Sequence, residues 1–411
     1  MRIVLATCGS RGDVQPMIAL SLALQSAGHD VLLVGPPEKA LWARQLGCPY
    51  KKFGADITAI LNDMKDAVSL RTNIASFFLV RQELHSQFKV LPQIIRNTDL
   101  VIGSSLMFAL SSIAQAMNIK YRFVAFTPQL FPSAYHPFLT IKTQMLPHWC
   151  NGMSWKIATL LDKFNLTFLI NRYRKKMGLA PIDTAWDHIL GDHTIVACDE
   201  EVAKVPLDVK KTFVQTGYLH LDLPAETQPE LDRFLKKGEK PIYAGFGSMP
   251  PKDQAKNIPL LVTAAKRVGK RIIIAKFWEN LSEHKFSRDV FFIKNYPHLK
   301  LFPKTAAVIH HGGAGTTAAA AISGVPQVII PHILDQYFHG QKIYRSNMGA
   351  KPIWRSKLTA DKLASALENC LSNPKIKQAA KKTGESINRN KSLQLTVKTI
   401  ERSFCYKNRA L

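Results

Sequence analysis

The sequence predicts an α/β protein of two Rossmann-like domains, each built around a parallel sheet. The first reason is length, because 411 residues at about 100–200 residues per domain suggest two domains. The second is the N-terminus, where an apolar run at 3–6, a helical stretch at 14–27 and an apolar run at 30–34 follow in β-α-β order. The third is a similar strand–turn–helix–strand unit at 306–330.

Composition limits the classes of protein that the chain can belong to. The N-terminus leads directly into a strand, without a basic and then an apolar segment, so no secretory signal is expected. No run of about 18 apolar residues occurs, so no membrane span is expected. The six cysteines form no CxxC pair, which indicates reduced thiols and not a zinc site or disulfide framework. These features predict a cytoplasmic protein.

The charge balance is strongly basic. Lysine and arginine total 55 against 30 acidic residues, which gives a formal net charge of +25. Such a surface attracts anions. No nucleic-acid-binding module is recognisable, so no nucleic-acid partner is expected. Two interpretations stay open: peripheral contact with an anionic membrane, or a soluble protein with a basic surface.

The first predicted domain covers residues 1–217, and its first loop carries the strongest chemical signal. The apolar strand at 3–6 is followed by Ser10 and Arg11 between two glycines, and then by Asp13. Ligands of parallel sheets bind at the carboxyl ends of strands, so this loop is expected to face a crevice. A carboxylate there is suitably placed for a general base, although Asp13 could instead only cap the following helix. Ser10 and Arg11 are expected to hold an acceptor or a phosphate, or to shape the loop.

Three apolar segments of this domain have two open interpretations each. A helical segment at 69–96 carries a wide apolar face, and a loop at 127–138 is rich in aromatic residues and proline. The helical segment could line an apolar acceptor site or be core, and the loop could line an apolar acceptor site or act as a lid. A helix at 153–178 has an apolar face and ends in the basic cluster 172–176, which suits either an interfacial helix or ordinary packing.

The second predicted domain covers residues 239–390, after a polar, proline-containing linker at 218–238. Its first strand ends in Gly247 and Ser248, a small turn that can approach a phosphate. The organising stretch is residues 306–336, where a strand runs into His310, His311 and a glycine-rich helix start. Glycines allow close backbone approach, and a helix N-terminus favours phosphate. The lysine of a P-loop is absent.

Several strings in the chain resemble those of one enzyme family. GSRGDVQP, TGY…LDLP, FGSM, HHGGAGTT and the Asp335–Gln336 pair are similar to family-1 GT-B glycosyltransferases, in particular sterol 3-beta-glucosyltransferases and glycopeptide glycosyltransferases. The resemblance implies a GT-B fold, in which two Rossmann-like domains face each other across a cleft. It implies an acceptor-binding first domain, a nucleotide-sugar-binding second domain and a C-terminal helix at 391–411 that returns to the first domain.

The resemblance also implies roles for individual residues. Asp13 corresponds to the general base, with Ser10 and Arg11 in the acceptor loop. The implied nucleotide-sugar contacts come from glycines, histidines, a tryptophan and the residues that hold sugar hydroxyls: Gly247, Ser248, Trp278, His298, His311, Gly313, Gly315, Thr316, Asp335 and Gln336. The chain departs from the pattern where Phe277 replaces the usual glycine before Trp278. This departure weakens the expectation that Trp278 stacks on the nucleoside base.

The expected function is inverting transfer of a hexose, glucose from UDP-glucose, to the hydroxyl of a sterol or other lipophilic acceptor. Two alternatives remain: transfer to a soluble natural-product aglycone, or a membrane-associated binding protein that kept the fold without turnover. No cofactor is expected besides the UDP-sugar substrate. No D-x-D pair occurs, so no metal is expected, and the helix end would neutralise the leaving diphosphate.

Overall fold

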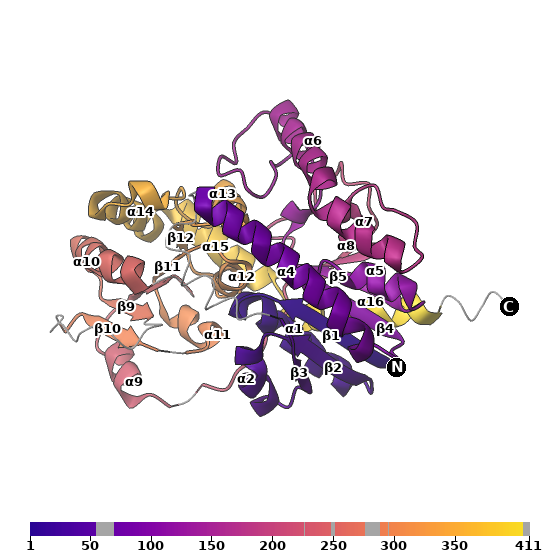
Figure 1. Cartoon of the computed structure of the whole chain (residues 1–411). Coiled ribbons are helices and arrows are strands. Elements are labelled where there is room, and N and C mark those ends of the chain that lie inside the picture. The colour runs from indigo at the N-terminus through magenta and orange to yellow at the C-terminus, as the bar shows by residue number, and fades with distance from the viewer. Residues whose placement is uncertain (55–69, 226, 248–250, 276–287, 295, 406–411) are drawn as a thin grey trace.

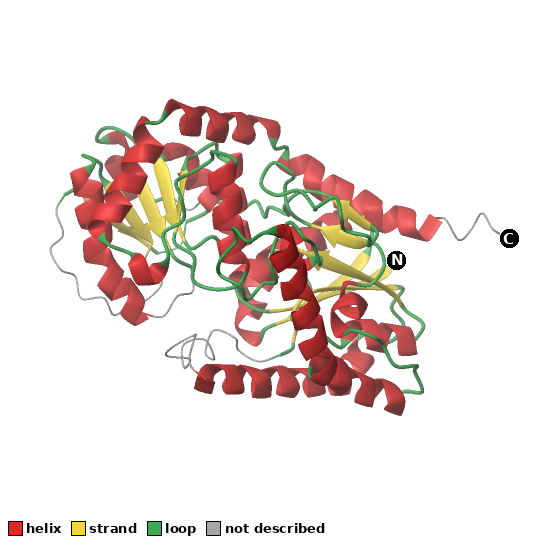
Figure 2. Cartoon of the chain, turned by 90° about the horizontal axis from the view of Figure 1, so that it is seen from above, coloured by secondary structure: helices red, strands yellow, loops and turns green. Residues whose placement is uncertain are grey.

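The structure is a computed structural model of the chain and describes residues 1–54, 70–225, 227–247, 251–275, 288–294 and 296–405. The described residues form two α/β domains, each with a parallel sheet covered by helices (Figure 1). Seen from above, the two sheets lie side by side with helices between and around them (Figure 2). The predicted α/β class with two parallel-sheet domains is therefore confirmed.

The N-terminal sheet contains seven described strands in the order β3-β2-β1-β4-β5-β6-β7, all parallel. The order reverses at β1, which pairs with both β2 and β4. After the exposed Arg2, the residues of β1 are buried on both faces, as expected for a central parallel strand. The strands are β1 (Arg2–Cys8), β2 (Asp30–Gly35), β3 (Tyr50–Lys52), β4 (Leu100–Ser105), β5 (Lys120–Ala125), β6 (Thr194–Val196) and β7 (Phe213–Gln215).

Helices cover both faces of this sheet. In the view of Figure 1, α4 crosses the front of the domain and α6 stands at its top. The segment predicted as one helix at 153–178 is two helices, because the backbone of Asn165 leaves the helical region at φ −117° and ψ −98°. The helices are α1 (Arg11–Ser26), η1 (Pro37–Lys39), α2 (Ala40–Gln45), α4 (Leu70–Ile94), α5 (Leu110–Ala116), η2 (Pro128–Leu130), α6 (His148–Phe164), α7 (Leu166–Lys176) and α8 (Ala185–Leu190).

The C-terminal sheet contains five described strands in the order β10-β9-β8-β11-β12, again parallel. They are β8 (Ile242–Gly245), β9 (Ile272–Ala275), β10 (Val290–Ile293), β11 (Ala307–His310) and β12 (Gln327–Ile329). The helices from residue 251 to 386 are α10 (Pro251–Arg267), α11 (His298–Leu301), η3 (Phe302–Lys304), α12 (Ala314–Ile322), α13 (Asp335–Arg345), η4 (Arg355–Lys357), α14 (Ala360–Ser372) and α15 (Pro374–Ser386).

Two segments join the domains. The first begins with residues 218–221, all four of which are buried, and continues to α9 (Pro229–Lys236). This helix packs on the C-terminal domain through Leu231 and Phe234. The second is α16 (Arg389–Cys405), which returns to the N-terminal domain, as Figure 2 shows. There Val397 and Ile400 join the core that contains β1.

No helix among the described residues is both long and apolar enough to cross a membrane.

Candidate active site

Asp13 lies in the first turn of α1, directly after β1, and its carboxylate accepts three hydrogen bonds. Oδ2 accepts from the Ser10 backbone N–H at 2.7 Å and from Ser10 Oγ at 3.0 Å, and Oδ1 accepts from Ser105 Oγ at 2.6 Å. Strand pairing explains the last contact, since Cys8 at the end of β1 lies opposite Ser105 at the end of β4. Gly9 has φ +154°, and a Cβ there would collide with the carboxylate, so this approach requires glycine.

The Asp13 carboxylate has a contact beyond the helix cap. Ser10 and Asp13 do form a capping box at the start of α1, but the capping bonds use only Oδ2. Oδ1 faces Ser105. Burial raises the pKa of the Asp13 carboxyl, while the hydrogen bonds from Ser105 and Ser10 act in the opposite direction. A desolvated carboxylate held by fixed donors has the properties of a general base.

The glycine-rich turn after β11 leads into α12, where His310 and His311 have different surroundings. His310 is buried in the sheet, with Nε2 2.9 Å from Gln327 Oε1 and Nδ1 accepting from the Gly312 N–H at 3.1 Å. Gly312 has φ +91°, and a Cβ there would be 2.9 Å from the Gln336 carbonyl oxygen. In the described part of the chain no side chain caps α12. Its first N–H groups therefore remain available to an anion.

His311 lies beside this helix start. Its ring fits between two glycines, since a Cβ on Gly247 would be 3.0 Å from His311 Cε1 and one on Gly313 would be 2.5 Å from Nε2. Nδ1 is buried and has no hydrogen-bond partner among the described residues. Burial, with a smaller contribution from His339, lowers the pKa of His311 to about 4. The ring is therefore neutral at pH 7 and can donate one N–H to a ligand oxygen.

Asp335 and Gln336 begin α13. Gln336 Oε1 accepts from the N–H groups of His332 at 2.8 Å and Ile333 at 3.2 Å. The amide nitrogen of Gln336 is therefore the group that can donate a hydrogen bond to a ligand. Burial raises the pKa of Asp335, His339 lowers it and the Asp13 charge raises it. The two aspartates come from different domains and are close enough for their charges to interact.

Arg11 of the N-terminal domain and His298 of the C-terminal domain also lie where the two domains meet. The Arg11 guanidinium lies over the Trp42 ring, 5.1 Å from its centroid. His298 Nε2 is 3.2 Å from Tyr243 Oη, and its ring stacks on Phe302 at 4.5 Å. Burial, with contributions from Arg11 and His311, lowers the pKa of His298 to about 3. Arg11 and His298 are thus brought together with His311 from opposite domains.

Of the remaining predicted site residues, some lie at the start of α12 and others fall outside the described residues. Gly315 and Thr316 lie in the first turn of α12. Ser248 and Trp278 lie outside the described residues. Among the residues that the structure describes, no group of three or more metal-ligand side chains occurs.

Two family models match the chain. Residues 3–135 match the glycosyltransferase family 28 N-terminal domain, and residues 260–400 match the erythromycin biosynthesis protein CIII-like C-terminal domain. Vancomycin aglycone glucosyltransferase from Amycolatopsis orientalis is 31% identical over 379 residues, covering 90% of each chain. The chain belongs to the GT-B glycosyltransferases.

Other relatives of this glycosyltransferase agree with that assignment. Sterol 3-beta-glucosyltransferase UGT80A2 from Arabidopsis thaliana is 30% identical over 400 residues, which are 92% of this chain and 62% of the relative. The kitacinnamycin glycotransferase structure has a TM-score of 0.73 at 15% identity and covers 98% of this chain and 99% of its own. The VinC structure with dTDP has a TM-score of 0.71 at 19% identity, covering 98% and 100%. At these identities the two structures support the fold alone, and they confirm the predicted GT-B architecture.

Three polar residues of this glycosyltransferase site escaped the sequence analysis. Ser105 has φ +53°, unusual for a serine, and bonds Asp13. Tyr218 is buried, and its hydroxyl lies against α12, where a Cβ on Gly315 would be 2.6 Å from Oη. Both ring nitrogens of His332 are buried without a partner in the described chain. Only Tyr218 had a signal, since it belongs to the recognised TGY string, but the linker assignment hid it.

The aromatic loop at 127–138 is mostly packed, and its residues Pro132, Ser133 and Ala134 line one side of an open pocket of about 510 Å³ beside α6. Phe131 is fully buried. Phe138 packs edge-on against Trp155 with ring centroids 5.1 Å apart, and His136 meets Phe338 of the other domain at 5.4 Å. This loop therefore contributes core and domain contact, and its role as the lining of an acceptor site or as a lid stays a prediction.

Proposed function

We propose that this glycosyltransferase inverts the anomeric centre as it moves glucose from UDP-glucose to the hydroxyl of a sterol or other lipophilic acceptor. The observation that carries the proposal is the pairing of two half-sites. Asp13, held by Ser10 and Ser105, faces Asp335 and the uncapped start of α12 from the opposite domain. A base on one side and an anion site on the other suit a displacement between them.

The donor half-site is the C-terminal domain. The first N–H groups of α12 and the neutral His311 ring would hold the diphosphate. The Asp335 carboxylate and the Gln336 amide nitrogen would hold sugar hydroxyls, because vicinal hydroxyls need acceptors and a donor at neighbouring positions. Two similar structures contain thymidine diphosphate, so a dTDP-sugar is the competing donor.

The reaction is one displacement. Asp13 Oδ1 accepts the proton of the acceptor hydroxyl as its oxygen bonds to the anomeric carbon. The bond from that carbon to the diphosphate breaks on the opposite face, and its electron pair leaves with the nucleoside diphosphate. The N–H groups of α12 and His311 stabilise the growing negative charge. Attack opposite the leaving group inverts the configuration.

The acceptor has more than one candidate. Sterol glucosyltransferases match most of the chain, but so does vancomycin aglycone glucosyltransferase at similar identity. A soluble aglycone is therefore the second candidate, and a binding protein without turnover is the third. The intact hydrogen bonding of Asp13 favours turnover.

A mass-spectrometric transfer assay without added metal tests the proposal. UDP-glucose and dTDP-glucose are each incubated with sterols and, separately, with phenolic and glycopeptide aglycones. A hexose mass shift on a sterol with UDP-glucose is the expected result. Transfer only to soluble aglycones would replace the acceptor proposal, and transfer only from dTDP-glucose would replace the donor. Nucleotide binding without any transfer would favour the binding protein.

A further inference from the structure

One face of α6 and the start of α7 exposes an unusual run of large apolar side chains. The spacing of three to four residues puts them on one side of the helix. Their exposed fractions range from 46% to 79%. We call this set the apolar stripe; it consists of Trp149, Met153, Ile157, Leu160, Leu161, Phe164 and Phe168.

The opposite face of α6 is fixed to the domain by specific bonds. Asn151 Nδ2 donates to the Ala134 carbonyl at 2.9 Å, and Trp155 Nε1 donates to the His136 carbonyl at 3.1 Å. Both side chains are buried. The apolar stripe is therefore exposed because the helix is held with its other face inward. Contiguous exposed apolar surface of this kind marks a binding face.

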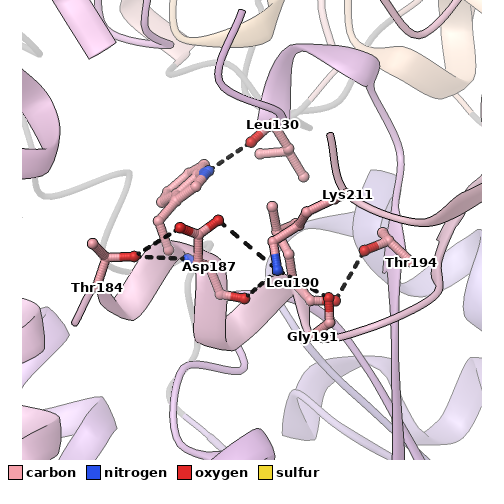
Figure 3. Close-up of polar contacts among 8 residues, drawn as sticks. Leu130, Thr184, Asp187, Leu190, Gly191, Thr194 and Lys211 are labelled. Carbon is pink, nitrogen blue, oxygen red and sulfur yellow. Dashed lines mark hydrogen bonds and ion pairs between the residues drawn. The ribbon is translucent and has the colours of Figure 1, made fainter. Parts of the chain in front are cut away.

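The short helix α8, which packs against α6 and α7, is anchored in turn. Figure 3 shows Lys211 Nζ donating to the carbonyls of Asp187 at 2.9 Å and Gly191 at 3.1 Å, and Thr194 Oγ1 donating to the Leu190 carbonyl at 2.9 Å. At the other end, the hydroxyl of Thr184 accepts from the Asp187 N–H at 3.3 Å. The helix that packs against α6 and α7 is therefore itself held in place by hydrogen bonds.

Basic side chains accompany the apolar stripe. Lys156 and Lys163 are exposed on α6, and Arg172, Lys175 and Lys176 are exposed on α7. Positions 172, 175 and 176 follow Phe168 at helical spacing, so they continue the same side of α7. An apolar face flanked by lysine and arginine is typical of helices that lie in a membrane interface.

A basic pocket adjoins the end of the stripe, between α4 and α7. Its volume is about 460 Å³, and its lining includes Arg81, His85, Arg172 and Lys176. Of the described residues that line it, none is acidic. His85 Nδ1 is 2.7 Å from Tyr173 Oη, which orients the ring at the pocket edge. Such a pocket attracts a phosphate group.

Charge decides among the possible occupants of this face. A second copy of the chain would bring another +25 molecule and a second basic cluster to the same surface. We infer that the apolar stripe and the basic pocket dock this protein on membranes that contain anionic phospholipid. The stripe enters the acyl boundary and the pocket takes a lipid phosphate. This inference does not depend on which acceptor the enzyme uses.

Vesicle flotation tests this inference. The full chain is mixed with phosphatidylcholine vesicles, or with vesicles in which part of the lipid is phosphatidylserine, at low and at high salt. The expected result is binding to the anionic vesicles that weakens with salt, because salt screens exposed charges. Equal binding to both vesicle types, or no binding to either, would overturn the inference.

Matched variants locate the contact. Phe164→Asp is expected to weaken binding at least about tenfold, because it removes exposed apolar area that the membrane would bury. Leu41→Asp is its control, since Leu41 is 71% exposed on α2, far from α6 in Figure 1. Arg172→Glu with Lys176→Glu should cost at least about twentyfold at roughly fivefold per charge. Its control is Lys362→Glu with Lys375→Glu, two exposed positions on the C-terminal domain.

Thermal unfolding of each variant checks that it remains folded. Equal loss of binding in a test variant and its control would refute the assigned location. Light scattering gives a further check. A wild-type dimer that Phe164→Asp converts to monomer would show that a second copy covers the stripe, which also refutes membrane docking.

Discussion

Ser105 offers the sharpest test of the Asp13 site, because the strand beside it supplies a matched control. Ser105 Oγ donates to Asp13 Oδ1 at 2.6 Å. Ser104, one residue earlier on β4, has a fully buried hydroxyl with no partner among the described residues. Ser105→Ala therefore removes a hydrogen bond to the carboxylate, and Ser104→Ala removes a similar hydroxyl without touching it.

The expected effect follows from which protonation state the bond favours. A donor to a carboxylate favours the charged form, and the Ser105 bond lowers the pKa of Asp13 against the raising effect of burial. Removing it raises that pKa, so a larger fraction of the base is protonated at low pH. A hydrogen bond to a charged group contributes about 1.5–3 kcal/mol. On the acid side of the pH profile, kcat/KM should therefore fall by roughly 10- to 100-fold.

The assay is the pH dependence of kcat/KM for wild type, Ser105→Ala and Ser104→Ala with one donor and one acceptor. Ser105→Ala should lose activity mainly at low pH and approach wild type as pH rises. Ser104→Ala should follow the wild-type profile. A Ser105→Ala profile with an unmoved acid limb, or an equal displacement in Ser104→Ala, would refute the role of Asp13 as the titrating base.

Three further results are expected. Gly315→Ala should destabilise the protein by about 1–3 kcal/mol in urea unfolding, since its methyl would crowd the Tyr218 hydroxyl, and Tyr218→Phe should recover part of this loss; a more stable Gly315→Ala protein would contradict that contact. Leu334→Gly should leave the melting temperature unchanged or raise it, because Leu334 holds φ +48° and ψ −127° while half exposed; a clear drop would argue against backbone strain there. Transfer should survive EDTA, because in the proposed mechanism α12 and His311 stabilise the leaving diphosphate without a metal; loss that Mg²⁺ restores would contradict this.

The sequence predicted the parts of the site that are local in the chain. The loop at Asp13 and the glycine-rich start of α12 each consist of consecutive residues. A strand, a tight turn and a helix start have direct sequence signals, so both could be recognised. The two parallel sheets followed from the same signals. Ser105 could not be found this way, because its contact with Asp13 depends on the register of β1 and β4.

Contacts between the domains were also beyond prediction. Tyr218 was assigned to a linker because its neighbours are polar, yet its hydroxyl lies against Gly315, almost a hundred residues away. The break at Asn165 was missed for a different reason. Apolar periodicity continues through it, so only the backbone shows that α6 and α7 are separate helices.

The most direct test of the proposed chemistry is a comparison of transfer and nucleotide binding in Asp13→Asn. Asparagine keeps the size of the side chain and its ability to accept the Ser10 capping bonds, but it cannot take a proton. Transfer measured by mass spectrometry should fall by about 10²- to 10⁴-fold, while calorimetric binding of the nucleoside diphosphate should stay near wild type. Near-wild-type transfer by Asp13→Asn would show that another group accepts the acceptor proton.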